Sequence, residues 1–268
     1  MNLAKRFKVR PGRRIRLSEF DADDTAGISK GKAEKMLAQN LDHIFKLQYN
    51  LFAEHKRALL IVLQGLDAAG KDGVIRRVMS GLNPQGCRVT SFKVPSREEL
   101  DHDFLWRIHK AVPCLGEIGI FNRSHYEDVL VVRVHGLAPE SVWSARYGQI
   151  NEFEKILAGN GVTVVKFFLH ISKGEQKKRL TERLEDPAKN WKFTPADAEE
   201  RKCWDDYTGA YEDVLARCST KLAPWYVIPS DHKWFRNLAV SAIVLQCLEK
   251  MDPRIPEPSP GLAGIRIR

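Results

Sequence analysis

The stretch from Gly65 to Gly73 has the residue types and the spacing of a loop that binds phosphate groups. It reads Gly-Leu-Asp-Ala-Ala-Gly-Lys-Asp-Gly, and it lies between the apolar run 59–63 and a helical pattern. Glycines permit backbone angles that a side chain disfavours, and the N–H groups at a helix start attract anions. The spacing matches G-x-x-x-x-G-K, whose lysine adds a positive charge. The residues expected to surround the phosphates are Gly65, Ala68, Ala69, Gly70, Lys71 and Gly73.

Two acids depart from the usual form of such a loop. Asp72 stands where Ser or Thr is expected to hold Mg²⁺, and it has two interpretations, a replacement for that hydroxyl or a solvated acid in the first helical turn. Asp67 lies inside the loop, where a carboxylate repels phosphates unless a cation bridges them. We therefore expect Asp67 to bind Mg²⁺ or to hold the attacking phosphate. The alternative is an acid stabilised by the positive end of the helix.

A second motif, residues 121–128, follows another apolar strand pattern and reads Phe-Asn-Arg-Ser-His-Tyr-Glu-Asp. An acid near this strand end commonly organises Mg²⁺, but this chain has Asn122 there. Asn122 and the two acids one helical turn later, Glu127 and Asp128, are expected at the phosphate or nucleotide site. Arg123 is placed to grip a transferred phosphoryl group, with a structural salt bridge as the alternative. His125 is expected to be structural, because transfer between phosphates needs little proton chemistry.

The third group of charges lies on the predicted helix 173–185 and in the loop after it. Arg179 and Arg183 are four residues apart and share a helix face, while Lys189 and Lys192 belong to the charged loop 187–195. Basic residues beside a mobile segment are typical of a lid that closes on phosphates and excludes water. The alternative is a solvated basic helix face.

Alternating strand and helix patterns must position these groups. The expected strands are 59–64, 88–94, 117–121, 163–170 and 225–228, and the expected helices are 31–55, 73–81, 96–111, 124–135, 140–159, 173–185, 197–217 and 233–250. The strand runs are nearly continuously apolar, as in strands buried on both faces. The order predicts an α/β fold, a parallel sheet sandwiched by helices, with ligands beyond the carboxyl ends of its strands.

The chain of 268 residues shows no repeat and no linker, so we expect one domain over residues 1–268. The proline-rich tail 252–268 is expected to be loosely ordered. Residues 1–16 carry seven Lys or Arg and no acid. They suit either an arm that binds a polyanion or a frayed, solvated terminus, and the composition slightly favours the terminus.

The composition indicates where the protein works and what it binds. A net charge of +9 suits an anionic partner, although a merely basic enzyme is an equal alternative. The five cysteines form no C-x-x-C pair, which favours reduced thiols over disulfides or a zinc site. No apolar run approaches the roughly 18 residues that span a bilayer, and the basic start lacks the apolar core of a signal peptide. We expect a cytoplasmic protein without a membrane partner.

Three segments together resemble the polyphosphate kinase 2 family: 65–73, 121–128, and 183–193 with its Lys-Asn-Trp-Lys-Phe sequence. The similarity extends over about residues 20–250. It implies a P-loop kinase fold with five parallel strands in the order 2-3-1-4-5 and a helical lid at about 183–205. It also implies phosphoryl transfer between inorganic polyphosphate and a nucleotide, dependent on Mg²⁺ or alternatively Mn²⁺.

The resemblance also implies roles for single residues. Asp67 would be the essential acid and metal ligand, Lys71 the phosphate-binding lysine, and Arg123 a catalytic clamp, and Arg179 and Arg183 would match arginines on the lid side. Many family members have Asp at the position of Asn122, and the Asn form resembles the subgroup that accepts both AMP and ADP. Family members are commonly oligomers, so we expect a homo-oligomer that uses adenine nucleotides, with guanine nucleotides as a further option.

Two other functions compete with this interpretation. An ATP-dependent nucleoside monophosphate kinase would share the fold, but it would have Ser or Thr after the lysine and no acid in place of Asp67. A nucleic-acid-binding module would show aromatic and basic residues interleaved on one face. The aromatic residues fall mostly in apolar strands or near the lid, so nucleic acid is not an expected partner.

Overall fold

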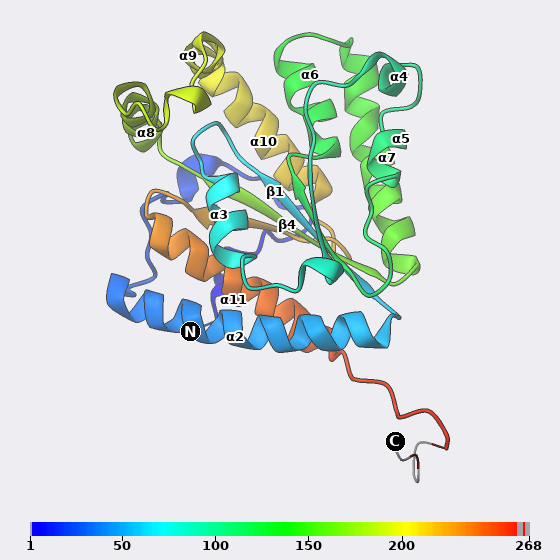
Figure 1. Cartoon of the computed structure of the whole chain (residues 1–268). Coiled ribbons are helices and arrows are strands. Elements are labelled where there is room, and N and C mark those ends of the chain that lie inside the picture. The colour runs from blue at the N-terminus through cyan, green and yellow to red at the C-terminus, as the bar shows by residue number, and fades with distance from the viewer. Residues whose placement is uncertain (1, 262–264, 266–268) are drawn as a thin grey trace.

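The computed structural model describes residues 2–261 and 265, and its core is one parallel five-stranded sheet. The strands are β1 (Ala58–Gln64), β2 (Cys87–Ser91), β3 (Ile118–Asn122), β4 (Val162–His170) and β5 (Trp225–Pro229). Their order across the sheet is β2-β3-β1-β4-β5 (Figure 1). This architecture confirms the predicted α/β fold and the strand order implied by the resemblance.

The sheet is buried on both faces because alternate residues of its central strand enter two separate apolar clusters. Leu59, Ile61 and Leu63 of β1 point into one cluster, and Ala58, Leu60 and Val62 point into the other. A strand covered on both sides is expected to carry a nearly continuous apolar run. This burial accounts for the unbroken apolar run that precedes the glycine loop.

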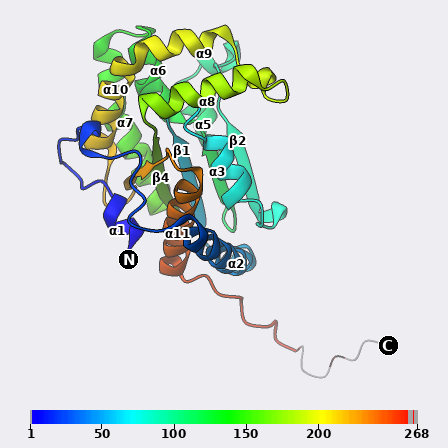
Figure 2. The same cartoon turned by 90° about the vertical axis from the view of Figure 1, so that its left-hand side faces the viewer.

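Each face of the sheet is covered by its own set of helices (Figures 1 and 2). The first face carries α1 (Leu3–Phe7), α2 (Lys30–Glu54), α3 (Lys71–Val78) and α11 (Lys233–Met251). The second face carries α5 (Trp106–His109), the 3-10 helix η3 (His125–Val129), α7 (Glu140–Gly159) and α10 (Trp204–Cys218). The remaining elements are α4 (Arg97–Leu100), α6 (Val131–Val134), α8 (Lys173–Glu185), α9 (Pro195–Glu200), and the 3-10 helices η1 (Leu17–Glu19), η2 (Pro84–Gly86), η4 (Asn190–Lys192) and η5 (Arg201–Cys203).

Three predicted helices are interrupted in the structure. Helix 96–111 is two short helices, α4 and α5, since the Asp103 carboxylate accepts the Leu105 N–H between them. Helix 124–135 is η3 followed by α6, because His125 and Tyr126 are drawn into the core. Helix 197–217 is broken at η5, and α10 begins only at Trp204.

The strand predicted at 88–94 was wrong in its extent and in its burial. The strand covers Cys87–Ser91 at the sheet edge, and Val89 is exposed. An edge strand has a neighbour on one side only, so its apolar run is not buried like that of a central strand.

The predicted frayed N-terminus was also wrong. Leu3, Phe7, Val9 and Ile15 are buried, and the Val9 N–H donates to the Trp225 carbonyl at 2.9 Å. The segment therefore covers the open edge of β5, which protects it from pairing with another chain.

The described part of the tail, residues 254–261 and 265, is exposed and forms no helix or strand, and it leads away from the body of the molecule (Figure 1). The rest of the predicted loose tail, 262–264 and 266–268, lies outside the described residues. Within the described ranges, none of the helices combines the length and the hydropathy needed to cross a bilayer.

Candidate active site

The two motifs meet because the strands that precede them are neighbours. β1 and β3 run parallel, with Leu63 opposite Asn122, so the glycine loop and Arg123 leave the sheet at the same edge. The Arg123 N–H donates to the Leu63 carbonyl at 3.1 Å. The adjacency of the two motifs is thus a property of the parallel sheet.

The loop turns sharply between β1 and α3, and two glycines make the turn possible. Gly70 has a φ of +106°, and a Cβ on Gly65 would lie 2.9 Å from the Leu169 carbonyl. Ala68 also adopts a left-handed conformation, with a φ of +63°. Such angles are costly for a residue with a side chain, so contacts around Ala68 must hold it there.

Lys71 folds back across the loop that it follows. Its Nζ donates to the Gly65 carbonyl at 2.6 Å. Burial lowers the pKa of Lys71, and the nearby Arg123 guanidinium lowers it further. Asp67, Glu127 and Asp72 act in the opposite direction and favour the charged ammonium group, as an anion bound in the loop would also do.

Arg123 and Asp67 face each other across the end of the sheet. Arg123 Nη2 lies 3.1 Å from Asp67 Oδ1, and Arg123 Nη1 lies 3.6 Å from Glu127 Oε2. Burial disfavours the guanidinium charge, but Glu127 and Asp67 outweigh it and raise the pKa of Arg123. The guanidinium thus stays charged at a position from which it can reach a transferred phosphoryl group.

The second acid of the loop, Asp72, is tied to the end of β3. The Asn122 amide Nδ2 donates to Asp72 Oδ1 at 2.8 Å. Among the described residues, no group of three His, Cys, Asp or Glu side chains is arranged to hold a metal ion alone. Mg²⁺ typically binds one or two carboxylates together with substrate phosphates and water, and Asp67 and Asp72 at the loop fit that donor set.

Asp128, which the sequence placed at the phosphate site, instead faces α7. Its Oδ1 lies 3.1 Å from Arg146 Nη1, which also donates to its backbone carbonyl at 3.0 Å. Burial raises the pKa of Asp128 to about 6, although Arg146 and Arg107 act in the opposite direction. Among the predicted acids, Asp67, Asp72 and Glu127 lie at the loop or beside Arg123, whereas the Asp128 carboxylate binds Arg146 of α7.

The raised pKa of Asp128 predicts a pH-dependent stability difference. Between the usual pKa near 3.8 and about 6, the folded chain holds this proton more tightly than the unfolded chain does, so rising pH costs stability. An Asp128→Asn variant does not lose this stability, because Asn does not titrate. Its stability relative to the wild type should rise by roughly 2 kcal/mol between pH 4.5 and 7. Urea unfolding at both pH values measures the difference, with the exposed Asp42→Asn as control. A stability difference between variant and wild type that is the same at both pH values would contradict the raised pKa of Asp128.

Two arginines hold the outer side of the loop. Arg179 is buried and donates to the Ala68 carbonyl at 3.0 Å and to the Ser230 and Asp231 carbonyls at 2.7 and 2.8 Å. Arg236 of α11 donates to the Ala69 carbonyl at 3.0 Å. Burial and the neighbouring Arg179 lower the pKa of Arg236 to about 9. These bonds hold the Ala68 and Ala69 carbonyls away from the anion side of the loop.

Arg236 was not predicted, and its position explains two loop glycines. A Cβ on Gly70 would lie 1.8 Å from Arg236 Nη1, and a Cβ on Gly73 would lie 2.8 Å from Nη2. The available signal was one arginine in the largely apolar stretch 234–244. That signal does not say which segment the arginine contacts, since the loop lies more than 160 residues earlier in the chain.

These contacts predict a graded series of alanine substitutions. Gly148 of α7 has open space around it, so Gly148→Ala should stabilise the protein by about 0.5–1 kcal/mol through helix propensity. In Gly73→Ala the close contact with Arg236 should cancel this gain in stability. Gly70→Ala should cost about 2 kcal/mol or more, because it adds left-handed strain to the overlap. Thermal unfolding tests the order, and equal effects at the three positions would contradict it.

Two cavities flank the loop, and their linings differ. The basic cavity, about 590 Å³, is lined by Arg76, Arg77, Arg183, Lys189 and Lys233 beside Arg179 and Arg236, with Glu34 and Glu182 as its acids. The aromatic cavity, about 300 Å³, is lined by Trp204, Tyr207 and Tyr211 together with Asp67 and Arg123. Lys192, the remaining predicted lid residue, is exposed and lies over the Trp191 ring.

Comparisons with known proteins agree with this geometry. Residues 27–256 match the family model for polyphosphate kinase 2. The chain is 52% identical to the AMP/ADP-polyphosphate phosphotransferase of Meiothermus ruber, over 95% of this chain and 96% of the relative. It is 45% identical to the ADP-polyphosphate phosphotransferase of Rhodopseudomonas palustris, over 96% of this chain and 93% of the relative.

A solved structure gives the same assignment. The crystal structure of polyphosphate kinase 2 from Arthrobacter aurescens TC1 superposes with a TM-score of 0.94 at 42% identity, over 98% of this chain and 94% of that one. The match includes the loop, the Arg123 motif and the lid segment, since it covers nearly the whole chain. The chain belongs to the polyphosphate kinase 2 family.

Proposed function

We propose that the protein transfers the terminal phosphoryl group between inorganic polyphosphate and a nucleoside mono- or diphosphate, with Mg²⁺ as the metal and Mn²⁺ as an alternative. The observation that carries this proposal is the loop itself, which lies between a basic cavity and an aromatic cavity, with Asp67 and Arg123 on the aromatic side. Relatives named AMP/ADP- and ADP-polyphosphate phosphotransferases support the same activity.

The basic cavity is the proposed site of the polyphosphate. Seven Lys and Arg side chains line it against two Glu, and such a concentration of one charge attracts a polyanion. It opens beside Gly70 and Gly73, so a polymer bound there would end at the loop. Lys189 belongs to the segment that the sequence predicts as a lid, and it would contact the polymer from the lid side of the cavity.

The aromatic cavity is the proposed site of the nucleotide. Trp204 and Tyr207 provide flat apolar surfaces and Leu130 and Val131 add aliphatic contacts, which together suit a purine base, adenine or alternatively guanine. Arg123 and Asp67 lie in the same cavity, where the nucleotide phosphates would meet the loop.

In the transfer step the protein positions charges rather than protons. The attacking phosphate oxygen is already ionised, so no general base is required. Lys71, the loop N–H groups and Arg123 stabilise the negative charge of the transferred group. Asp67 and Asp72 would hold Mg²⁺, which would neutralise phosphate charge. The Asn122 amide orients Asp72 through its hydrogen bond. Residues of the lid segment exclude water, which is a competing acceptor.

A donor and acceptor assay tests the proposal. Long-chain polyphosphate, Mg²⁺ and ADP should yield ATP, and AMP in place of ADP should yield ADP and then ATP. Reactions without polyphosphate exclude disproportionation of ADP by an adenylate kinase activity. Formation of ATP only when another nucleoside triphosphate is supplied would favour the monophosphate kinase. Higher salt should weaken polyphosphate use more than nucleotide use, because the polymer contacts more charges.

We further propose that the protein is a cytoplasmic homo-oligomer that does not bind nucleic acid. The five free cysteines suit a reducing compartment, and α2 exposes the aromatic residues Phe45, Tyr49 and Phe52 on one face. Light scattering of the wild type and of a Phe45→Ser, Tyr49→Ser variant tests the oligomer. An unchanged mass would exclude this face as the interface.

A further inference from the structure

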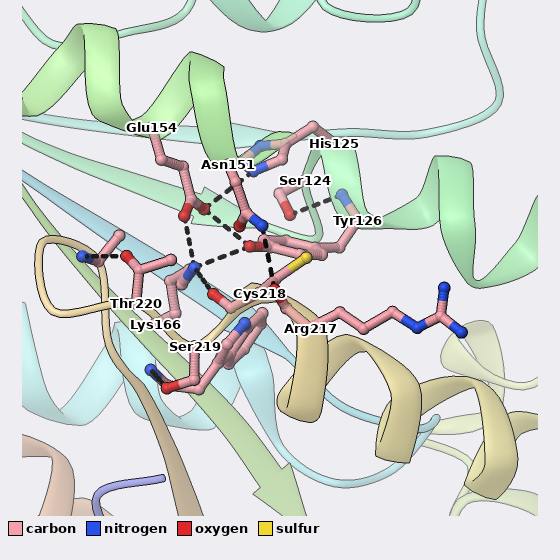
Figure 3. A network of polar contacts seen from close by, with 12 residues as sticks. Ser124, His125, Tyr126, Asn151, Glu154, Lys166, Arg217, Cys218, Ser219 and Thr220 are labelled. Atoms are coloured by element: carbon pink, nitrogen blue, oxygen red, sulfur yellow. Dashed lines mark hydrogen bonds and ion pairs between the residues drawn. The ribbon is translucent and has the colours of Figure 1, made fainter. Parts of the chain in front are cut away.

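A buried network of charged and polar side chains contacts His125 and Tyr126, which follow Arg123 in the second motif (Figure 3). Glu154 of α7 and Lys166 of β4 form an ion pair with 2.5 Å between Nζ and Oε2, and both side chains are almost completely buried. Lys166 Nζ also donates to the Tyr126 hydroxyl at 2.8 Å and to the Cys218 carbonyl at 2.7 Å. All three donors of the ammonium group therefore have partners.

The network is unexpected at this position of the sheet. The residues two before and two after Lys166 in β4, Val164 and Phe168, belong to the apolar cluster of this face. A lysine in such a row loses its hydration, and replacing a buried ion pair by apolar residues is often neutral or stabilising. The stability of the fold therefore does not explain why a charged pair is present here. The contacts of Glu154 and Lys166 indicate another role.

Those contacts converge on the segment that follows Arg123. Glu154 Oε1 accepts from the Tyr126 hydroxyl at 2.8 Å and lies 3.3 Å from His125 Nε2. The buried Ser124 hydroxyl accepts the Tyr126 N–H and the Gln64 amide, both at 3.2 Å. The three residues after Arg123 are thus each held by side-chain hydrogen bonds.

Arg123 itself needs such support, because its backbone is in an unfavourable conformation. Its φ is +62°, in the left-handed region that a residue with a long side chain rarely adopts. Strained angles of this kind persist only where the surrounding structure over-determines them. The conformation turns the side chain back toward Asp67 and Glu127 at the loop.

We propose that Glu154 and Lys166 are positioning residues for phosphoryl transfer: the ion pair anchors His125 and Tyr126, and this anchor holds Arg123 in the left-handed conformation that aims its guanidinium at the transferred group. The inference rests on the proposed function, in which Arg123 contacts that group. Neither Glu154 nor Lys166 lines the two cavities beside the loop, so their effect on the reaction passes through Arg123.

A double-mutant cycle tests the proposal. Tyr126→Phe removes one hydroxyl, and Glu154→Gln keeps the shape of the side chain without its charge. In the wild-type background each substitution should lower kcat about 5- to 30-fold while the KM values for polyphosphate and ADP change less than about threefold, since a mispositioned arginine affects the transition state more than binding. In an Arg123→Ala background the same substitutions should change kcat less than about twofold, because the group that they position is absent.

A purely structural role would give a different pattern. It would lower kcat by the same factor in both backgrounds, or only in proportion to the folded fraction measured by circular dichroism, and either result would overturn the proposal. Ile44→Ala, a buried residue of α2 on the opposite face of the sheet, is the matched control, and it should lower the melting temperature without changing kcat per folded molecule. If Glu154→Gln does not fold, Tyr126→Phe decides the case, and an unchanged kcat in that variant would also overturn the proposal.

The outcomes separate this inference from the proposed function. If the wild type makes no ATP from polyphosphate and ADP, the proposed function has failed. If the wild type is active but Tyr126→Phe and Glu154→Gln act additively with Arg123→Ala, the proposed function stands and the positioning role has failed.

Discussion

Replacement of Asp67 by Asn should lower kcat by about 10²- to 10⁴-fold with ADP, Mg²⁺ and polyphosphate. Asn keeps the size of the side chain but loses the charge that would hold the metal in the proposed function. Charge stabilisation by a metal ion is worth several kcal/mol, and each 1.36 kcal/mol corresponds to about tenfold in rate. Turnover measured over a Mg²⁺ titration tests this, and the variant should also need a higher Mg²⁺ concentration for half-maximal rate.

The fold should tolerate this substitution. The contact between Asp67 and Arg123 involves side chains that are 28% and 42% exposed, and pairs of this kind contribute about 1 kcal/mol or less to stability. The exposed Asp42→Asn on α2 is the matched control for the loss of one carboxylate. A near-wild-type rate for Asp67→Asn would mean that Asp67 is only an acid at the helix end.

Replacement of Arg123 by Ala should lower kcat by about 10³-fold or more, the range found for arginines that stabilise phosphoryl transfer in trans or in cis. The KM values should change less than kcat, because in the proposed function the guanidinium would act mainly on charge that develops in the transition state. Arg123→Lys should fall in between, since lysine keeps the charge but loses the planar fork that binds two oxygens at once.

Unfolding measurements separate this role from a structural one. Arg123 pairs with Asp67 and Glu127 at a partly exposed position, so its loss should shift stability by about 1 kcal/mol or less. A large drop in melting temperature together with unchanged activity per folded molecule would show that the arginine serves as a structural salt bridge.

Much of the fold could be predicted from the sequence because its signals are short in range. Strands that are buried on both faces carry nearly continuous apolar runs, and β1, β3, β4 and β5 were found at or near their true bounds for that reason. The loop 65–73 was recognised because glycine, lysine and strand context act within a few residues of one another. Predictions failed where a distant partner decided the outcome: the N-terminal segment is ordered by β5, and helix 124–135 is interrupted because the core takes up His125 and Tyr126.

The same distinction applies to the site. The sequence by itself determined which residues have the chemistry for phosphate binding: Asp67 and Lys71 in one motif, Arg123 in another, each marked by its immediate neighbours. Only the tertiary structure decided how they are held. In the tertiary structure Asp128 pairs with Arg146, and Arg179 and Arg236 donate to carbonyls of the loop. Glu154 and Lys166 form a buried ion pair that contacts Tyr126. These contacts join residues that are 12 to 167 positions apart, and charge placement of this kind leaves no local pattern because burial and partner choice depend on the packing of the whole chain.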